Sequence, residues 1–382
     1  MIYLDNNATT RLDPRVLEAM MPFLTEEYAN AASTHPFGLR AHEAVKLARQ
    51  QVAKLLGCEP TELIFTSGAT EAINLAIKGV VENYASRGKH IVTVQTEHTA
   101  VLDVCRYLET QGCEVTYLPV QSDGLLDLAT VQAAVRPDTI LVSVMMVNNE
   151  TGVIQPTREI AELTHTAGAL FMTDATQAVG KLPLNVESLG IDLLTFSGHK
   201  FYGPKGIGGL YVRQRKPRRV KLAALLHGGG HERGWRSGTL NVPSIVGLGH
   251  AAELCRQTMP AEATRIGALR DDLETSLLAI PGTRVNGNHQ HRIYNTANIL
   301  FEGCDSDAMI MGLEGIAISN GSACTAASLD PSHVLLAMAL DETAAFSCLR
   351  FSLGRFNKDT EITEVHSLLC ELVNKLRAFT MT

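Results

Sequence analysis

Residues 169–177 read ALFMTDATQ and residues 191–200 read IDLLTFSGHK, and these two stretches decide the fold. Each begins as a mainly apolar run of strand length and ends in polar residues, Asp174 in the first stretch and Ser197 to Lys200 in the second. Apolar runs of this length indicate strands that are covered on both faces, as in a parallel sheet. Ligands of such sheets bind outside the carboxyl ends of the strands. The polar residues that end the two runs are therefore candidates for a functional site.

Helical and strand patterns alternate on either side of these stretches. Asp13 and Pro14 open a helix, and Gly57 ends another that begins near Gly38. Further strands are expected at residues 62–66, 90–95, 114–119, 139–147 and 208–212, with helices at 71–84, 99–110 and 156–167. The alternation predicts an α/β fold in which helices flank a mainly parallel, seven-stranded sheet.

The pattern changes after about Gly247, where a long helical run continues to Ala279. Three short strands follow, around Asn298, Ile316 and Phe351. A chain of 382 residues exceeds the size at which one hydrophobic core usually stops growing. We therefore expect a large domain at residues 13–247 and a smaller α+β domain made of residues 1–12 and 248–382.

Composition narrows the class of protein. The net charge of −7 argues against a protein that mainly grips nucleic acid or an anionic membrane. The basic stretch at 213–221 is either a solvated connection, which we favour, or a docking patch for an acidic partner or an RNA. No apolar stretch is long enough to span a bilayer, and the N-terminus does not resemble a secretory signal. Eight dispersed cysteines fit a reducing cytosol, so we expect a cytoplasmic protein.

Four polar clusters follow predicted strands, and each has a chemical interpretation. The turn Ser67–Thr70 leads into a helix, so its free backbone N–H groups suit a phosphate. Asp174 could pair with a protonated pyridine nitrogen, and Lys200 could form a Schiff base if burial lowers the pKa of its amine. His98 could stack on a flat cofactor ring or shuttle protons. Taken singly, each cluster has a structural alternative: a helix or turn cap, a surface lysine, or a hydrogen-bonded histidine.

Cys324 differs from the other seven cysteines in its surroundings. It lies in ISNGSACTAAS at residues 318–328, where the small residues on both sides cannot bury a core face. We expect a mobile surface loop, in which an exposed cysteine suits a mobile nucleophile. His227 and His231 flank three glycines, but no further ligands lie nearby in the sequence, so we expect no metal site.

Read in order, nine segments resemble the motifs of the cysteine desulfurases. They span nearly the whole chain, which makes the resemblance far more specific than any single motif. The segments are YLDNNATT (3–10), TSGATE (66–71), NNETG (148–152), DATQ (174–177), SGHK (197–200), HGGGHERG (227–234), RSGT (236–239), GSAC (321–324) and RFSLG (350–354). The setting of Cys324 resembles the NifS/IscS-like group and not the SufS-like group.

The resemblance implies a homodimeric fold-type I enzyme of the class V aminotransferase family that depends on pyridoxal 5'-phosphate. It implies that Lys200 bonds the cofactor, that His98 stacks on its ring, and that Asp174 pairs with the ring nitrogen. Gln177 contacts the ring hydroxyl, and Asn149 lies on the cofactor and substrate side. The phosphate is held by the backbone at Ala69, by Thr70, Ser197 and His199, and by Thr239 of the neighbouring subunit. Arg350 holds the substrate carboxylate as a two-pronged ion pair.

The implied reaction removes sulfur from L-cysteine, giving L-alanine and a persulfide on Cys324. Lys200 takes the α-proton, and the Cys324 thiolate then attacks the substrate sulfur. The acceptor of that sulfur is left open between iron–sulfur cluster assembly, tRNA thiolation and DNA phosphorothioation. Two rival functions are a different pyridoxal-phosphate enzyme, such as a selenocysteine lyase or an aminotransferase, and a noncatalytic scaffold. The set of Lys200, Asp174, His98 and Arg350 argues against the scaffold.

Overall fold

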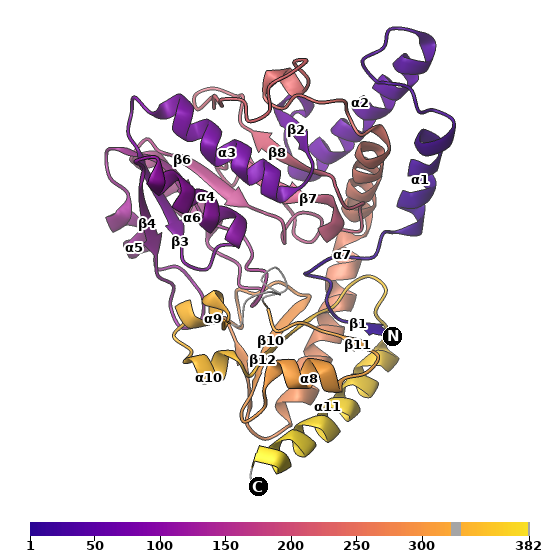
Figure 1. Ribbon diagram of the computed structural model, residues 1–382, viewed down its shortest axis with the longest axis vertical. Helices are drawn as coiled ribbons and strands as arrows, with labels where there is room; N and C mark the ends of the chain where they lie inside the picture. The colour runs from indigo at the N-terminus through magenta and orange to yellow at the C-terminus, as the bar shows by residue number, and fades with distance from the viewer. Residues whose placement is uncertain (322–329, 381–382) are drawn as a thin grey trace.

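The computed structural model describes residues 1–321 and 330–380, and Cys324 lies outside them. A seven-stranded sheet and its helices form one part of the molecule, and a smaller set of strands and helices forms the other (Figure 1). Helix α7 (Val242–Leu278) runs from the first part into the second. Within the described residues, no helix is both long and apolar enough to cross a membrane.

The large sheet confirms the predicted α/β fold. The order of its strands is β2-β8-β7-β6-β5-β3-β4. Strand β8 is antiparallel to β2 and to β7, and all other neighbours are parallel. The strands are β2 (Leu63–Thr66), β3 (His90–Val94), β4 (Glu114–Leu118), β5 (Thr139–Ser143), β6 (Leu170–Asp174), β7 (Leu193–Ser197) and β8 (Gly208–Val212).

One strand is shorter than the sequence predicts. The apolar run at 139–147 was expected to be a single strand, but β5 ends at Ser143. Beyond it, Val144 and Met146 still donate to carbonyls of the neighbouring strand β6 and its end, whereas the Met145 N–H donates to the carboxyl of Glu97. The chain therefore leaves the sheet on one side while it stays apolar and buried, which a hydrophobicity pattern cannot distinguish from a strand.

Alternate strand residues pack into two cores on opposite faces of the sheet. Leu193 belongs to the core covered by α3 and α4, and Leu194 to the core covered by α2, α6 and α7. This period of two is what a strand covered on both faces requires. The helices of this part are α1 (Pro14–Thr25), α2 (Pro36–Leu56), α3 (Ala69–Tyr84), α4 (Thr99–Thr110), α5 (Leu128–Ala134) and α6 (Thr157–Thr166).

The predicted helix boundaries at Asp13 and Gly57 are confirmed. The Asp13 carboxylate caps α1 by accepting from the N–H of Arg15. Gly57 ends α2 with a φ of 69°, a left-handed conformation that glycine adopts without steric cost.

The smaller part is built around an antiparallel sheet of order β12-β10-β9, with β1 and β11 paired in parallel beside it. The chain's first residues therefore lie with its last third. Its strands are β1 (Ile2–Tyr3), β9 (Thr283–Asn286), β10 (Thr296–Phe301), β11 (Ile316–Ala317) and β12 (Cys348–Ser352). Its helices are α8 (Ser306–Gly312), α9 (His333–Ala337), α10 (Glu342–Ala345) and α11 (Asp359–Thr380).

Candidate active site

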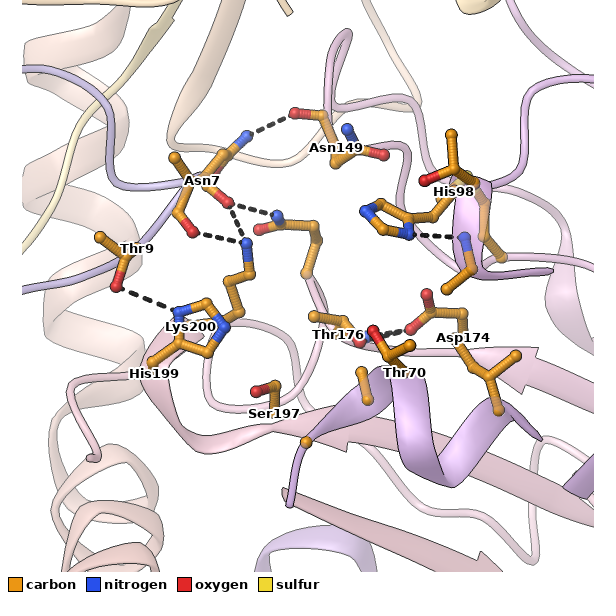
Figure 2. Close-up of a pocket in the computed structure, with 18 of the residues that line it drawn as sticks. Asn7, Thr9, Thr70, His98, Asn149, Asp174, Thr176, Ser197, His199 and Lys200 are labelled. Carbon is orange, nitrogen blue, oxygen red and sulfur yellow. Dashed lines mark hydrogen bonds between the residues drawn. The ribbon is translucent and has the colours of Figure 1, made fainter. Parts of the chain in front are cut away.

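A cavity of about 580 Å³ opens at the carboxyl ends of the parallel strands, where the smaller part meets the sheet (Figure 2). Ten of the twelve residues proposed from the sequence line it. They are Ala69, Thr70, His98, Asn149, Asp174, Gln177, Ser197, His199, Lys200 and Arg350. Thr239 is exposed and is not among the described residues that line this cavity, and Cys324 lies outside the described residues.

Lys200 follows β7 in a short 3-10 turn and projects into the cavity. Its Nζ donates to the backbone oxygens of Asn7 at 2.6 Å and Ala8 at 2.7 Å (Figure 2). These carbonyls come from the N-terminal segment, which crosses the cavity from the smaller part. These two hydrogen bonds hold the amine at a defined place in the cavity.

Asp174 ends β6 with its carboxylate in the cavity wall. Its Oδ1 accepts from Thr176 N at 2.9 Å, from Thr176 Oγ1 at 2.5 Å and from Thr195 Oγ1 at 3.4 Å. Because all three bonds end on Oδ1, Oδ2 is the atom available to a donor in the cavity. A protonated pyridine nitrogen is such a donor.

His98 stands at the N-cap of α4, and its Nδ1 accepts from the N–H of Ala100 at 3.1 Å. An accepting Nδ1 carries no proton, so the neutral ring is protonated at Nε2. The cap therefore fixes both the orientation and the tautomer of the ring. In Figure 2 the ring points into the cavity opposite Lys200.

The N-terminus of α3 forms one wall of the cavity. Its N-cap is Gly68, and within the described residues no side chain caps it, so the first N–H groups at Ala69 and Thr70 face the cavity unblocked. Ser197 and His199 lie across from them (Figure 2). Burial, assisted by the charge of Lys200, lowers the pKa of His199 to about 4, so its ring is neutral at neutral pH. Helix N–H groups, two hydroxyls and a neutral imidazole are donors suited to a phosphate.

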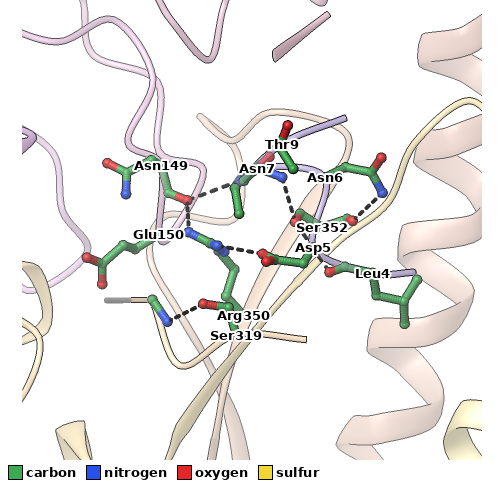
Figure 3. A network of polar contacts seen from close by, with 12 residues as sticks. Leu4, Asp5, Asn6, Asn7, Thr9, Asn149, Glu150, Ser319, Arg350 and Ser352 are labelled. Atoms are coloured by element: carbon green, nitrogen blue, oxygen red, sulfur yellow. Dashed lines mark hydrogen bonds and ion pairs between the residues drawn. The ribbon is translucent and has the colours of Figure 1, made fainter. Parts of the chain in front are cut away.

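Arg350 is buried in β12 and projects from the smaller part toward the cavity (Figure 3). Its Nη2 pairs with Asp5 at 2.7 Å, and its Nη1 donates to the backbone oxygen of Asn149 at 3.0 Å. Its Nε has no hydrogen-bond partner in the described part of the chain. Two of five N–H groups are therefore used for orientation, and the rest are available to a carboxylate.

Several lining residues were not proposed from the sequence. Asn7 and Thr9 belong to a motif quoted for the resemblance, but they received no role. Glu150 belongs to another quoted motif, NNETG, and also received no role. His333 gave no local signal, because it reaches the cavity only through the long-range fold. Polar members of this group include Asn7, Thr9, Glu150, Lys205 and His333.

The donor and acceptor set fits pyridoxal phosphate: a helix N-terminus for the phosphate, a carboxylate for the ring nitrogen and an amine for the aldehyde. The model of the aminotransferase class-V family matches residues 2–365. The chain belongs to the aminotransferase class-V family. Members of this family, including the cysteine desulfurases, depend on pyridoxal phosphate. The chain thus shares both the fold and the cofactor chemistry of fold-type I enzymes.

The relatives of this class-V chain are close in sequence and length. Cysteine desulfurase IscS of Anaeromyxobacter dehalogenans is 54% identical over 378 residues, which are 98% of this chain and 93% of the relative. The IscS of Pectobacterium carotovorum is 52% identical over 379 residues, with the same coverage. Both alignments therefore extend over nearly the whole chain.

Solved structures agree with these relatives. A NifS-like protein superposes with a TM-score of 0.89 at 38% identity, covering 100% of this chain and 99% of its own. SspA in complex with cysteine superposes with a TM-score of 0.83 at 38% identity, covering 92% of this chain and 99% of its own. DndA from Streptomyces lividans superposes with a TM-score of 0.78 at 39% identity, covering 90% of this chain and 97% of its own.

Proposed function

We propose that the chain is a pyridoxal-phosphate-dependent cysteine desulfurase, which converts L-cysteine to L-alanine and leaves a persulfide on Cys324. The observation that carries this proposal is a single cavity that is lined by Lys200, Asp174 and His98 and also by Arg350. The IscS relatives support the same reaction. SspA, solved with cysteine, supports the substrate.

The residues of the sheet would hold the cofactor. Thr70, Ser197, His199 and the backbone at Ala69 hold the phosphate, and Asp174 Oδ2 holds the proton of the ring nitrogen. When bound, pyridoxal phosphate supplies an electron sink for negative charge at the substrate α-carbon. Asp174 is buried and its Oδ1 is saturated with donors, so the carboxylate cannot turn away from the ring.

Lys200 and Arg350 would act on the substrate. Arg350 binds the L-cysteine carboxylate with the N–H groups that Asp5 and Asn149 leave available, which fixes the α-carbon in the cavity. Lys200 Nζ takes the proton from that carbon and returns it in the later steps. Asn149 and His98 flank the reacting group.

Cys324 would receive the sulfur. Its thiolate attacks the sulfur of L-cysteine and forms the S–S bond as the substrate's C–S bond breaks, and the carbon fragment takes up protons to leave as L-alanine. The atoms of one cysteine and one thiol equal those of one alanine and one persulfide, so no outside oxidant is needed. Gly321 and His333, which lie on either side of residues 322–329 in the sequence, both line the cavity.

The test is a matched assay of the wild type, Cys324→Ala and the control Cys370→Ala, with L-cysteine and dithiothreitol. We expect equal amounts of sulfide and alanine from the wild type and the control, and neither product from Cys324→Ala. Cys370 is a half-buried cysteine of α11 that is not among the described residues lining the cavity, so the control removes a thiol outside the site. Full activity in Cys324→Ala would overturn the persulfide step and favour a lyase.

The larger assembly is part of the same proposal. The enzyme is a homodimer of chains that each have a large domain at 13–247 and a small domain of 1–12 with 248–382. Thr239 of one subunit reaches the phosphate of the other. Its exposed position on its own chain supports this assignment. The protein acts in the cytoplasm and passes sulfur to an acceptor protein, with no direct contact to nucleic acid.

A further inference from the structure

Lys181 is a buried lysine to which the reaction above gives no role. Its residue is 5% exposed, and it follows the turn after β6, seven residues beyond Asp174. It is not among the described residues that line the cavity. Burying an ammonium group is costly unless its hydrogen bonds compensate, so a contact that uses this charge is expected.

The ammonium group is directed at one residue of the cavity wall. Lys181 Nζ donates to Gln177 Oε1 at 2.7 Å. Gln177 Nε2 in turn donates to the backbone oxygen of Asn7 at 2.9 Å. The same oxygen accepts from Lys200 Nζ at 2.6 Å. A chain of three hydrogen bonds thus links the buried lysine to the lysine in the cavity.

The direction of these bonds follows from the chemistry of the groups. A charged lysine can only donate, so the amide oxygen of Gln177 must face it. The amide nitrogen must then face the cavity, where one of its N–H bonds goes to Asn7. The second N–H is left for an acceptor within the cavity. With an apolar residue at position 181 this constraint on the amide oxygen is lost, and only the hydrogen bond to the Asn7 oxygen still favours the observed orientation.

We infer that Lys181 is a positioning residue that locks the side-chain amide of Gln177 with its N–H groups toward the cavity, where they donate to the anionic ring oxygen of the cofactor. This inference rests on the proposed function and deepens it. Lys181 does not touch the cofactor itself. It acts through Gln177, by disfavouring the amide orientation in which the Gln177 oxygen would face the anionic ring oxygen of the cofactor.

The charges around Lys181 make the lock sensitive to pH. Burial and the charge of Lys200 lower the pKa of Lys181 to about 7, and Arg350 acts in the same direction. The Cys255 thiol also faces it, but burial raises the pKa of that thiol to about 12, so the thiol is neutral. Below pH 7 the ammonium holds the amide. Above pH 7 the neutral amine can also accept a hydrogen bond, so it no longer fixes the orientation of the Gln177 amide.

The test is a double-mutant cycle on the binding of pyridoxal phosphate. Affinity for the apoenzyme and the visible spectrum of the bound cofactor are measured for the wild type, Lys181→Met, Gln177→Leu and the double variant. We expect Lys181→Met to weaken binding about five-fold at pH 6.5, in line with the loss of one well-oriented hydrogen bond. In the Gln177→Leu background the same change should alter affinity less than two-fold.

Two results would overturn the inference: an equal loss in both backgrounds, which means that Lys181 acts by packing, or no loss in either. If Lys181→Met does not fold, Lys181→Gln takes its place, because a glutamine can accept as well as donate and so permits both amide orientations. Failure of the proposed function is a separate outcome, in which the wild type itself binds no pyridoxal phosphate.

Discussion

Glu97 precedes His98 and binds the N–H of Met145, two residues beyond the end of β5. Its side chain is fully buried, and its Oε1 accepts from the N–H of Met145 at 2.5 Å. Its Oε2 has no partner in the described part of the chain. Burial raises the pKa of Glu97 well above its usual range, and the charge of Asp174 acts in the same direction. The raised pKa favours the neutral form of the Glu97 carboxyl.

Replacing Glu97 by glutamine tests this assignment. The raised pKa means that the carboxyl contributes to stability below its unfolded value near 4.5 and loses that contribution as pH rises toward its folded pKa. Glutamine keeps the acceptor for Met145 and cannot ionise. We expect the free energy of unfolding of Glu97→Gln to match that of the wild type at pH 5. At higher pH it should exceed the wild-type value, by up to about 1.4 kcal/mol per pH unit.

The measurement is urea unfolding from pH 5 to pH 9, with Glu109→Gln on the exposed side of α4 as the control. If the free energy of unfolding changes with pH in the same way for the wild type and Glu97→Gln, Glu97 is ionised in the folded protein. Glu109 is exposed and accepts from the Tyr117 hydroxyl on the surface, so its replacement should leave the pH dependence of the free energy of unfolding unchanged.

At the scale of elements, the phosphate wall depends on how closely two backbones approach. Gly208 in β8 pairs with Thr66 of β2 and with Ser197 of β7. A Cβ at position 208 would lie 2.7 Å from Gly68 Cα and would also meet the carbonyl of Phe196. Both obstacles are backbone atoms, which cannot rotate away. A side chain here would have to displace the turn that leads into α3.

Gly208→Ala should therefore weaken the binding of pyridoxal phosphate and lower the free energy of unfolding by about 1–3 kcal/mol, the usual cost of overpacking. Thermal unfolding and titration of the apoenzyme with the cofactor measure the two effects. Gly267→Ala in α7 is the control, because a Cβ there meets Tyr294 at an ordinary 3.6 Å and alanine favours helix. Equal behaviour of both variants would contradict the close approach.

Sequence alone predicted those elements whose signals are local. The cap at Asp13, the left-handed Gly57 and the strand ends at Asp174 and Ser197 each depend on neighbours in the chain, and all are confirmed. The short strands β1 and β9 were not predicted, because two to four residues carry too little periodicity.

The part of the site that could not be predicted comes from distant segments. Asn7 accepts from Lys200 across 193 residues, and Lys181 acts on the cavity through another side chain. No spacing in the sequence reports such contacts. The roles carried over from the resemblance located the ten lining residues, whereas the hydrogen bonds that orient them required the fold.

At the scale of the whole molecule, the N-terminal segment ties the two parts together at the cavity. Asn7 donates to the backbone oxygen of Asn149 and to Thr296 of β10, and Asp5 pairs with Arg350 (Figure 3). The cavity is thus built at a junction, where a substrate carboxylate bound to Arg350 would also contact the smaller part.

Two features of the surface favour the proposed homodimer. The segment that carries Thr239 is held against helices α2 and α3 by ion pairs of Arg49 with Glu232 at 2.5 Å and of Arg236 with Glu71 at 2.7 Å. Thr239 lies in this anchored segment and is exposed. Helix α1 and the residues after it leave an apolar stripe exposed, which a monomer seldom does. The stripe consists of Leu17, Met21, Leu24 and Tyr28.

The dimer proposal predicts complementation between two defective chains. Sedimentation should give twice the 41.3 kDa of one chain. Thr239→Ala homodimers should bind pyridoxal phosphate several-fold more weakly, because both phosphates lose a donor. In a mixed dimer with Lys200→Ala chains, the remaining Lys200 receives Thr239 from its partner, so its site should recover wild-type affinity. Borohydride trapping reads this site alone, because only one chain has the lysine. Affinity that stays weak in the mixed dimer would place Thr239 on its own subunit's phosphate.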